Sequence, residues 1–257
     1  MLHFQEFGEA SDKPTLLIVH GLFGSGRNWR AIAKRLSADR RVITVDMRNH
    51  GDSFWDDSHT YFDMAEDLAT VIQTLDSPVD IIGHSMGGKA AMLTALQHPK
   101  LVNKLIVVDI APVTYDHSQI SNVQVMQSIP LDQISRRSDA DKFMADYISE
   151  DMVRAFLLQS LTIGETQNSW VLNLAALATN MNDIVGFPKI DAQFTPPCLF
   201  IRGALSAYIL PQHHEALFHH FPNAKIHTID GAGHWVHAEA QRAFIGVVSD
   251  YLKSNPQ

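Results

Sequence analysis

The chain has 257 residues, of which 46% are hydrophobic and 19% charged, and its formal net charge is -8. This length suits one large α/β domain with a full hydrophobic core, and the composition argues against a disordered chain. The acidic balance disfavours nucleic acid or an anionic membrane surface as the main partner, because either would require a clustered basic face.

The single cysteine, Cys198, excludes an internal disulfide and favours a reducing compartment. It lies in an apolar run that predicts a buried strand, which argues against a reactive thiol. We see neither a secretory pattern at the N-terminus nor a run approaching the roughly 18 apolar residues of a membrane span. We therefore expect a cytoplasmic protein, without a membrane partner, that is a monomer or a small homo-oligomer.

Short apolar runs alternate along the chain with longer helix-like stretches, which is typical of a mainly parallel sheet covered on both faces. The sequence predicts an α/β fold with strands at 15–20, 41–46, 79–83, 104–109, 198–203 and 224–230. It predicts helices at 28–36, 61–75, 87–97, 211–221 and 238–252. Thr60 and Asp63 give the second helix a capping-box-like start.

The interval between 109 and 198 contains no clear strand, and its best helical pieces are 139–147, 151–161 and 170–181. A structureless loop of this length would be implausible inside a compact domain. We therefore expect a helical cap at 113–195, inserted between core segments 1–112 and 196–257. Its apolar residues could pack within the cap or line an acyl pocket: Phe156, Leu157, Leu158, Trp170, Leu172, Leu174 and Leu177.

Residues 83–87 form a G-x-S-x-G sequence between an expected strand and a helix rich in small residues. This context is typical of a nucleophile elbow, a sharp turn that presents a serine at a helix N-terminus. Gly83 and Gly87 lack the Cβ atoms that would clash in such a turn. The pattern predicts Ser85 as the nucleophile; the alternative is an ordinary turn with a serine N-cap.

The loop after the first buried strand, beginning at His20, predicts part of an oxyanion hole. Such a loop can direct one backbone N–H at the carbonyl oxygen under attack, beside the N–H of the residue that follows the nucleophile, here Met86. We expect Leu22 to supply the first donor, with Phe23 as the neighbouring possibility. We expect His20 to hold the loop through hydrogen bonds.

His234 is the expected general base, chosen from 14 histidines. It follows the last expected strand, in agreement with the chain order serine, acid, histidine, and flanking glycines allow its loop to bend. The spacing from His214 to His219 is one residue too long to place both side chains on one helix face, as a zinc motif requires. We therefore expect no metal and no cofactor.

The chain resembles the α/β-hydrolase superfamily of serine esterases from end to end, and most closely the small bacterial esterases of the YbfF type. Five motifs in the core, but none in the cap, carry the resemblance: HGLFGSGRNW, VDMRNHGDS, GHSMGGKA, VVDIAPV and GAGHWVHAE. The resemblance implies that the strand after the elbow lies between the nucleophile strand and the later strands.

The resemblance also implies a triad acid after the penultimate strand, but this chain has Gly-Ala-Leu-Ser at 203–206. A neutral hydroxyl is a poor substitute for a carboxylate, which must hold one histidine tautomer and stabilise the imidazolium. YbfF-like esterases use the end of an earlier strand, which is Asp109 here. Ser206 is expected to support the site by hydrogen-bonding to the imidazole or to Asp109; the alternative is that Asp109 only caps its loop.

Two other acids fit less well. Asp230 is too close in sequence to the base for comfortable geometry, and Asp46 belongs to a loop that resembles a structural loop of the family. The expected activity is hydrolysis of a small-molecule acyl ester or thioester, including acyl-CoA, through an acyl-enzyme on Ser85. The rivals are a lyase or C–C bond hydrolase on the same triad, and a non-catalytic small-molecule receptor.

Overall fold

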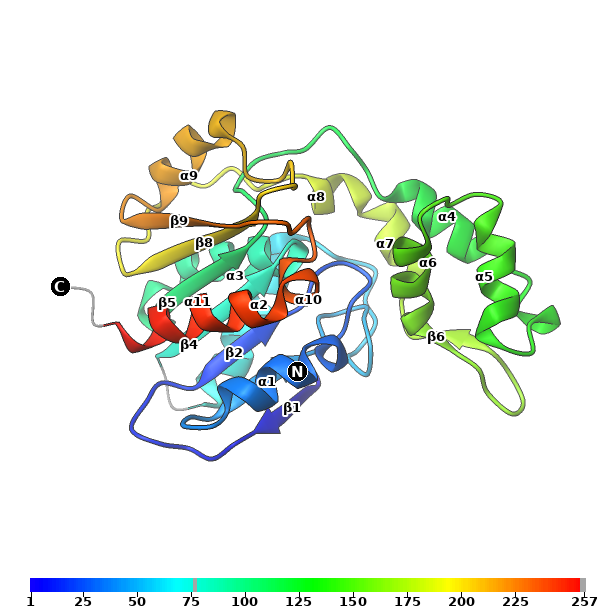
Figure 1. The fold of residues 1–257 in the computed structure, drawn as a ribbon, viewed down its shortest axis with the longest axis horizontal. Helices are drawn as coiled ribbons and strands as arrows, with labels where there is room; N and C mark the ends of the chain where they lie inside the picture. The colour runs from blue at the N-terminus through cyan, green and yellow to red at the C-terminus, as the bar shows by residue number, and fades with distance from the viewer. Residues whose placement is uncertain (76–77, 255–257) are drawn as a thin grey trace.

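The computed structural model describes residues 1–75 and 78–254 and is built around a seven-stranded sheet (Figure 1). The strand order is β1-β3-β2-β4-β5-β8-β9, in which β1 is antiparallel and the other pairings are parallel. The strands are β1 Phe4–Phe7, β2 Leu16–Val19, β3 Val42–Val45, β4 Val79–His84, β5 Val102–Val108, β8 Cys198–Gly203 and β9 Ala224–Ile229. Residues 76–77 and 255–257, which belong to the expected core segments 1–112 and 196–257, lie outside the described residues.

Helices cover both faces of this sheet because the strands alternate their apolar side chains between two clusters. Leu17 and Val19 pack in the cluster that contains α2 and α3, whereas Leu16 and Ile18 pack in the cluster that contains α1 and α11. The helices are α1 Arg30–Leu36, α2 Tyr61–Gln73, α3 Met86–Gln97, α9 His214–His220, α10 Val236–Glu239 and α11 Gln241–Lys253. The predicted doubly covered parallel sheet is confirmed, and β5 lies between β4 and β8 as expected.

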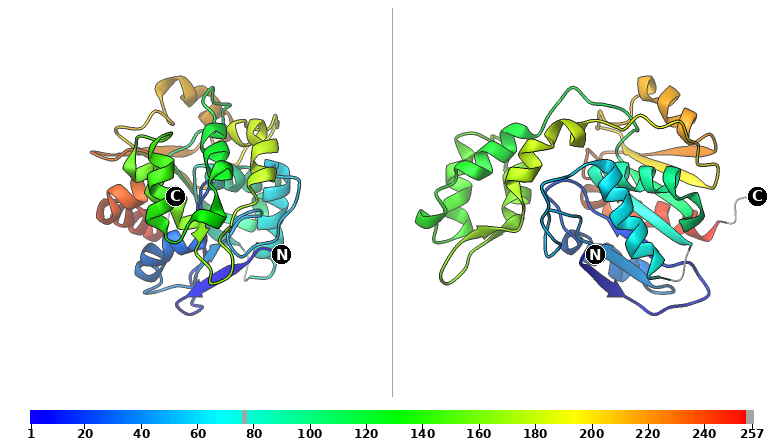
Figure 2. Two further views of the ribbon diagram at one scale, coloured as in Figure 1. Left: turned by 90° about the vertical axis from the view of Figure 1, so that its right-hand side faces the viewer. Right: turned by 180° about the vertical axis from the view of Figure 1, so that it is seen from behind.

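Helices α4 to α8 all fall between β5 and β8, and Figures 1 and 2 show most of them as a lobe beside the sheet. They are α4 Ile120–Ser128, α5 Arg137–Ala145, α6 Asp151–Leu157, α7 Leu174–Thr179 and α8 Met181–Val185. A short hairpin, β6 Leu161–Thr162 with β7 Ser169–Trp170, separates α6 from α7. The end of α8 is bound to the core, because the Tyr61 hydroxyl and the Lys89 ammonium donate to its last carbonyls.

Two expected helices differ from the structure. The helix expected at 170–181 is wrong at its start, because Trp170 pairs with Leu161 and α7 begins only after Asn173, whose side chain accepts from the Ala176 N–H. The helix expected at 238–252 is interrupted at Ala240, which has a non-helical conformation between α10 and α11. The capping box at the start of α2 is confirmed.

Several elements had no counterpart among the expected ones: the hairpin of β6 and β7, helix α8, strand β1 and helix α4. In β1 apolar and polar residues do not alternate regularly, and in α4 only Val123 and Met126 are buried. No helix in the described part of the chain is long and apolar enough to cross a membrane.

Candidate active site

Ser85 occupies the tight turn between β4 and α3. Its backbone has φ 53° and ψ -121°, a strained conformation for a residue with a side chain. The flanking glycines permit the turn: a Cβ on Gly83 would lie 2.4 Å from the Gly87 carbonyl oxygen, and a Cβ on Gly87 would lie 2.3 Å from that of His20. The sequence thus folds locally into the strand, turn and helix expected of an elbow.

His234 lies between Ser85 and Asp109. Its Nε2 is 3.1 Å from Ser85 Oγ, and its Nδ1 is 2.8 Å from Asp109 Oδ2. Because an ionised carboxylate can only accept hydrogen bonds, Nδ1 carries the proton and Nε2 is left to accept from the serine hydroxyl. The structure therefore brings the three expected residues into one hydrogen-bonded chain.

Asp109 directly follows β5 and is fully buried, with a positive φ of 53°. Besides His234, the Gly203 N–H donates to Oδ1 at 3.0 Å and the Ser206 hydroxyl donates to Oδ2 at 2.5 Å. A buried charge is costly unless it is paired and hydrogen-bonded, and these three donors meet that requirement. The loop-capping alternative does not account for the imidazole contact.

Ser206 contacts the acid and not the base. Its hydroxyl donates to Asp109 and accepts from the Tyr208 N–H at 3.2 Å, which fixes its orientation. The close approach of this turn to the His234 loop depends on Gly203, where a Cβ would lie 2.2 Å from the Gly233 carbonyl oxygen. Of the two partners expected for Ser206, the structure selects the carboxylate.

The imidazole of His234 has further neighbours that the sequence did not reveal. The ring of Tyr208 stacks on it, with centroids 4.0 Å apart, and the Tyr115 hydroxyl donates to the Tyr208 carbonyl at 2.6 Å. His84 Nε2 lies 3.0 Å from the His234 carbonyl oxygen and donates to it. Of these neighbours only His84 could have been found from the sequence, because it lies within the G-x-S-x-G pattern.

The two N–H groups expected to bind an oxyanion come from different segments: Leu22 lies in the loop after β2, and Met86 is the first residue of α3. The Phe23 N–H is occupied, because it donates to His50 Nε2 at 3.2 Å. In the described part of the chain no acceptor is bound to the N–H of Leu22 or of Met86, and both residues line the cavity around Ser85. Of the two expected donors, Leu22 is therefore the one left free.

Two neutral histidines hold this loop. The Met47 N–H donates to His20 Nε2 at 3.0 Å, so His20 Nδ1 carries the proton and donates to the Gly21 carbonyl. His50 accepts from Phe23 and, through Nδ1, donates to the Arg48 carbonyl at 2.9 Å. Burial lowers the pKa of both imidazoles, which keeps each available as an acceptor.

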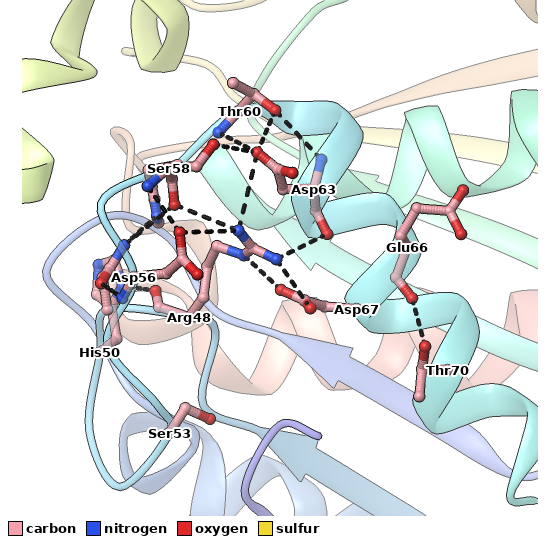
Figure 3. Close-up of polar contacts among 12 residues, drawn as sticks. Arg48, His50, Ser53, Asp56, Ser58, Thr60, Asp63, Glu66, Asp67 and Thr70 are labelled. Atoms are coloured by element: carbon pink, nitrogen blue, oxygen red, sulfur yellow. Dashed lines mark hydrogen bonds and ion pairs between the residues drawn. The ribbon is translucent and has the colours of Figure 1, made fainter.

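Arg48 fixes the loop that carries His50 (Figure 3). Its guanidinium forms a two-pronged ion pair with Asp67 on α2, at 2.5 and 3.0 Å, and also donates to the Ser58 carbonyl. Such bidentate pairs fix geometry as well as charge. The oxyanion loop is therefore connected to the body of α2 through buried polar contacts.

A cavity of about 390 Å³ opens at Ser85 between the core and the inserted segment. Of the apolar residues whose role was left open, Phe156 and Leu157 line it. Leu158 lines a second cavity, and the Trp170 indole donates to the Met126 carbonyl. The remaining members are buried in the core: Leu172, Leu174 and Leu177.

One group in the described residues has the composition of a metal site. Potential ligand atoms of His3, Asp46 and Asp52 lie within 4.8 Å of one another, beside the second cavity. Asp46 already accepts from the N–H groups of Gly26 and Asp52, at 2.7 and 3.0 Å. The first bond joins the loop after β3 to the helical turn that begins at Gly26, and the second fixes the loop itself, which gives the carboxylate a structural role.

A family model described as the α/β hydrolase fold matches residues 14–241. The chain therefore belongs to the α/β-hydrolase family.

Individual relatives narrow this class. The chain is 40% identical over 250 residues to the mouse sn-1-specific diacylglycerol lipase ABHD11, covering 93% of this chain and 81% of the relative. It is 40% identical over 245 residues to the Escherichia coli esterase YbfF, covering 92% of each. The solved structure of a marine microorganism esterase has a TM-score of 0.92 and 39% identity, covering 97% of this chain and 98% of that one. The resemblance to YbfF-type esterases is confirmed, and the chain is a carboxylic ester hydrolase.

The burial of two histidines leads to a prediction about how the stability of the protein depends on pH. Burial lowers the pKa of His59 and of His237 to about 3. Between pH 6.5 and 3 the unfolded chain therefore binds protons at these positions that the folded chain does not, so stability must fall as the pH falls. Each such histidine should remove about 1.4 kcal/mol of unfolding free energy per pH unit below about 6.5.

Urea unfolding at pH 7 and pH 5 measures this loss. In His237→Phe the new ring can still stack on Trp29. This variant should reduce the pH dependence of the unfolding free energy by the contribution of one histidine. His227→Phe on the exposed face of β9 is the matched control and should keep the wild-type dependence. A His237→Phe protein as acid-sensitive as wild type would contradict the assignment.

Proposed function

We propose that the chain hydrolyses small acyl esters through a covalent acyl-enzyme on Ser85, with His234 as general base and Asp109 as the orienting acid. The observation that carries the proposal is the hydrogen-bonded chain from Ser85 Oγ through His234 to the buried Asp109 carboxylate. The relatives named as esterases and lipases support the same class of reaction.

In the first step Ser85 Oγ attacks the acyl carbon and its proton passes to His234 Nε2. The imidazolium is stabilised by Asp109, which stays ionised, and then donates the proton to the departing alkoxide. In the second step His234 removes a proton from water, whose oxygen attacks the acyl carbon. The imidazolium returns this proton to Ser85 Oγ as the acyl–oxygen bond breaks, so that the serine hydroxyl is regenerated and the carboxylic acid product is released.

The negative charge that develops on the carbonyl oxygen would be bound by the N–H groups of Leu22 and Met86. Met86 is the first residue of α3, so its N–H belongs to a helix N-terminus, where the backbone dipoles favour negative charge. Donors already fixed before the reaction need no rearrangement when the charge forms. His20 and His50 would act indirectly, by holding the loop.

Residues 113–195 act, in this proposal, as a cap over the site. The cavity at Ser85 is lined by Phe156 and Leu157 of the inserted segment and by Ile184 and Val185 of α8. Such a wall would exclude water and present an apolar surface to the acyl or alcohol group. This apolar wall fits a small ester. Which chemical class of ester is preferred depends on the charge of the cavity.

Ser85→Ala tests the nucleophile. The variant should lose at least about 10⁴-fold in kcat/KM for a p-nitrophenyl ester, because no other group can form the acyl-enzyme. The circular dichroism spectrum should remain that of the wild type, since the turn depends on the glycines.

A fluorophosphonate should label Ser85 in the wild type, as seen by mass spectrometry of the labelled peptide, and should leave Ser85→Ala unlabelled. Ser128→Ala on the exposed face of α4 is the control for both assays. A wild-type protein that binds esters without turnover or labelling would support the receptor alternative.

Asp109→Asn and Ser206→Ala test the displaced acid. The asparagine preserves the shape of the side chain but favours the wrong histidine tautomer, a change that costs about 10⁴-fold in kcat in a serine protease. We expect about 10³- to 10⁴-fold here, because Ser206 contacts the acid and cannot itself orient the base. Ser206→Ala should cost about tenfold, as one of three hydrogen bonds to the carboxylate is lost.

Steady-state kcat on one ester, measured for both variants at the pH optimum of the wild type, gives the ranking. If Ser206→Ala lowered kcat more than Asp109→Asn does, the assignment of Asp109 as the orienting acid would be wrong. Equal losses would mean that Asp109 and Ser206 act only as a unit.

A further inference from the structure

The buried part of the wall of the cavity at Ser85 carries a cation, although the chain as a whole is acidic. The chain carries 28 acidic and 20 basic residues. Within the described residues, however, Glu150 is the one carboxylate that lines the cavity, and it is exposed at the start of α6. Lys89 is the one lysine or arginine in the same lining. Because Lys89 is buried whereas Glu150 is exposed to solvent, the buried part of the wall favours an anionic occupant.

Lys89 lies in the first turn of α3, four residues after the nucleophile. Its backbone N–H donates to the Ser85 carbonyl at 3.0 Å, so the two residues are separated by roughly 6 Å along the helix axis. Side chains on a helix lean towards its N-terminus, which directs Lys89 back towards the Ser85 turn. Lys89 and Ser85 both line the cavity, so the two side chains border the same space.

This ammonium lacks an anionic partner. Its Nζ donates to the carbonyls of Val185 and Gly186, at 2.9 and 2.5 Å, and lies 4.8 Å from the centre of the Tyr115 ring. No carboxylate forms an ion pair with it anywhere in the described part of the chain. Burial lowers its pKa to about 7, as expected for a cation that is desolvated without a counter-charge.

We propose that Lys89 is a substrate-specificity residue that pairs with a carboxylate on the acyl group, so that the preferred substrates are short half esters of dicarboxylic acids. The inference rests on the proposed ester hydrolysis at Ser85 and adds the substrate class. A single enclosed cation matches a monoanion, whereas a phosphate group would require several charged donors. The proximity of Lys89 to Ser85 limits the acyl chain to a few methylenes between its two ends.

Monomethyl glutarate and methyl valerate form the matched substrate pair, because they differ only by a terminal carboxylate in place of a methyl group. Methanol release gives kcat/KM for each. The wild type should prefer monomethyl glutarate. In Lys89→Met the ratio of the two values should fall by about 30-fold or more, the loss expected when one partner of a buried charge pair is removed.

Using the ratio within each variant removes any general loss of activity or of folded protein. Lys104→Met is the matched control, since Lys104 also binds backbone carbonyls, those of Leu252 and Ser254, but lies outside the cavity. It should keep the wild-type ratio. If Lys89 serves only to hold the end of α8, Lys89→Met will slow both esters equally, and the inference is overturned.

A measurement on the wild type alone covers the case in which Lys89→Met does not fold. Glutarate should inhibit methyl valerate hydrolysis competitively and with a lower inhibition constant than valerate; the reverse order would overturn the inference. Failure of the proposed function is distinct from either result. It would appear as hydrolysis of methyl valerate that survives in Ser85→Ala, whereas failure of the inference leaves Ser85-dependent hydrolysis with no preference for the carboxylate.

Discussion

The buried carboxylate of Asp109 is the constraint on which the site depends. A fully buried charge must find its hydrogen-bond donors within the protein, and Asp109 takes them from three places: the end of β8 at Gly203, the turn at Ser206, and the loop at His234. Satisfying this one group therefore holds together the ends of β5 and β8 and the loop after β9. The orientation of the imidazole follows from the same requirement, because an acceptor-only carboxylate determines which ring nitrogen carries the proton.

The sequence could predict those parts of the molecule whose chemistry is local. The turn at Ser85 needs small residues two positions on either side, and this requirement is visible in the chain as Gly83 and Gly87. The parallel strands β2, β3 and β4 are mainly apolar because both of their faces are buried. The contact between Asp109 and His234 could be predicted as well, since the absence of a carboxylate at 203–206 directs the search for one to the end of a neighbouring strand.

Contacts between distant segments could not be predicted in the same way. Tyr208 stacks on His234, and Tyr115 supports Tyr208, but neither tyrosine belongs to a spacing pattern. Similarly, the helix expected at 170–181 fails because Trp170 pairs with Leu161, a tertiary contact that overrides local propensity. The role of Lys89 is hidden for the same reason: in the sequence it is one residue of a small helix, and only the fold places it beside the end of α8.

The distribution of charge connects the site to its substrate. Among the described residues Glu150 is the one carboxylate that lines the cavity, and the charge of the buried Asp109 beside the site is stabilised by three hydrogen-bond donors. The neighbouring imidazoles are kept neutral by burial and serve as hydrogen-bond acceptors, so they add no positive charge. Within the described residues two groups at this wall lack an anionic partner: the N–H groups of Leu22 and Met86, and the ammonium of Lys89. Both favour negative charge, the first on the reacting carbonyl and the second at the far end of the acyl group. An ester with a carboxylate a few bonds from its carbonyl satisfies both.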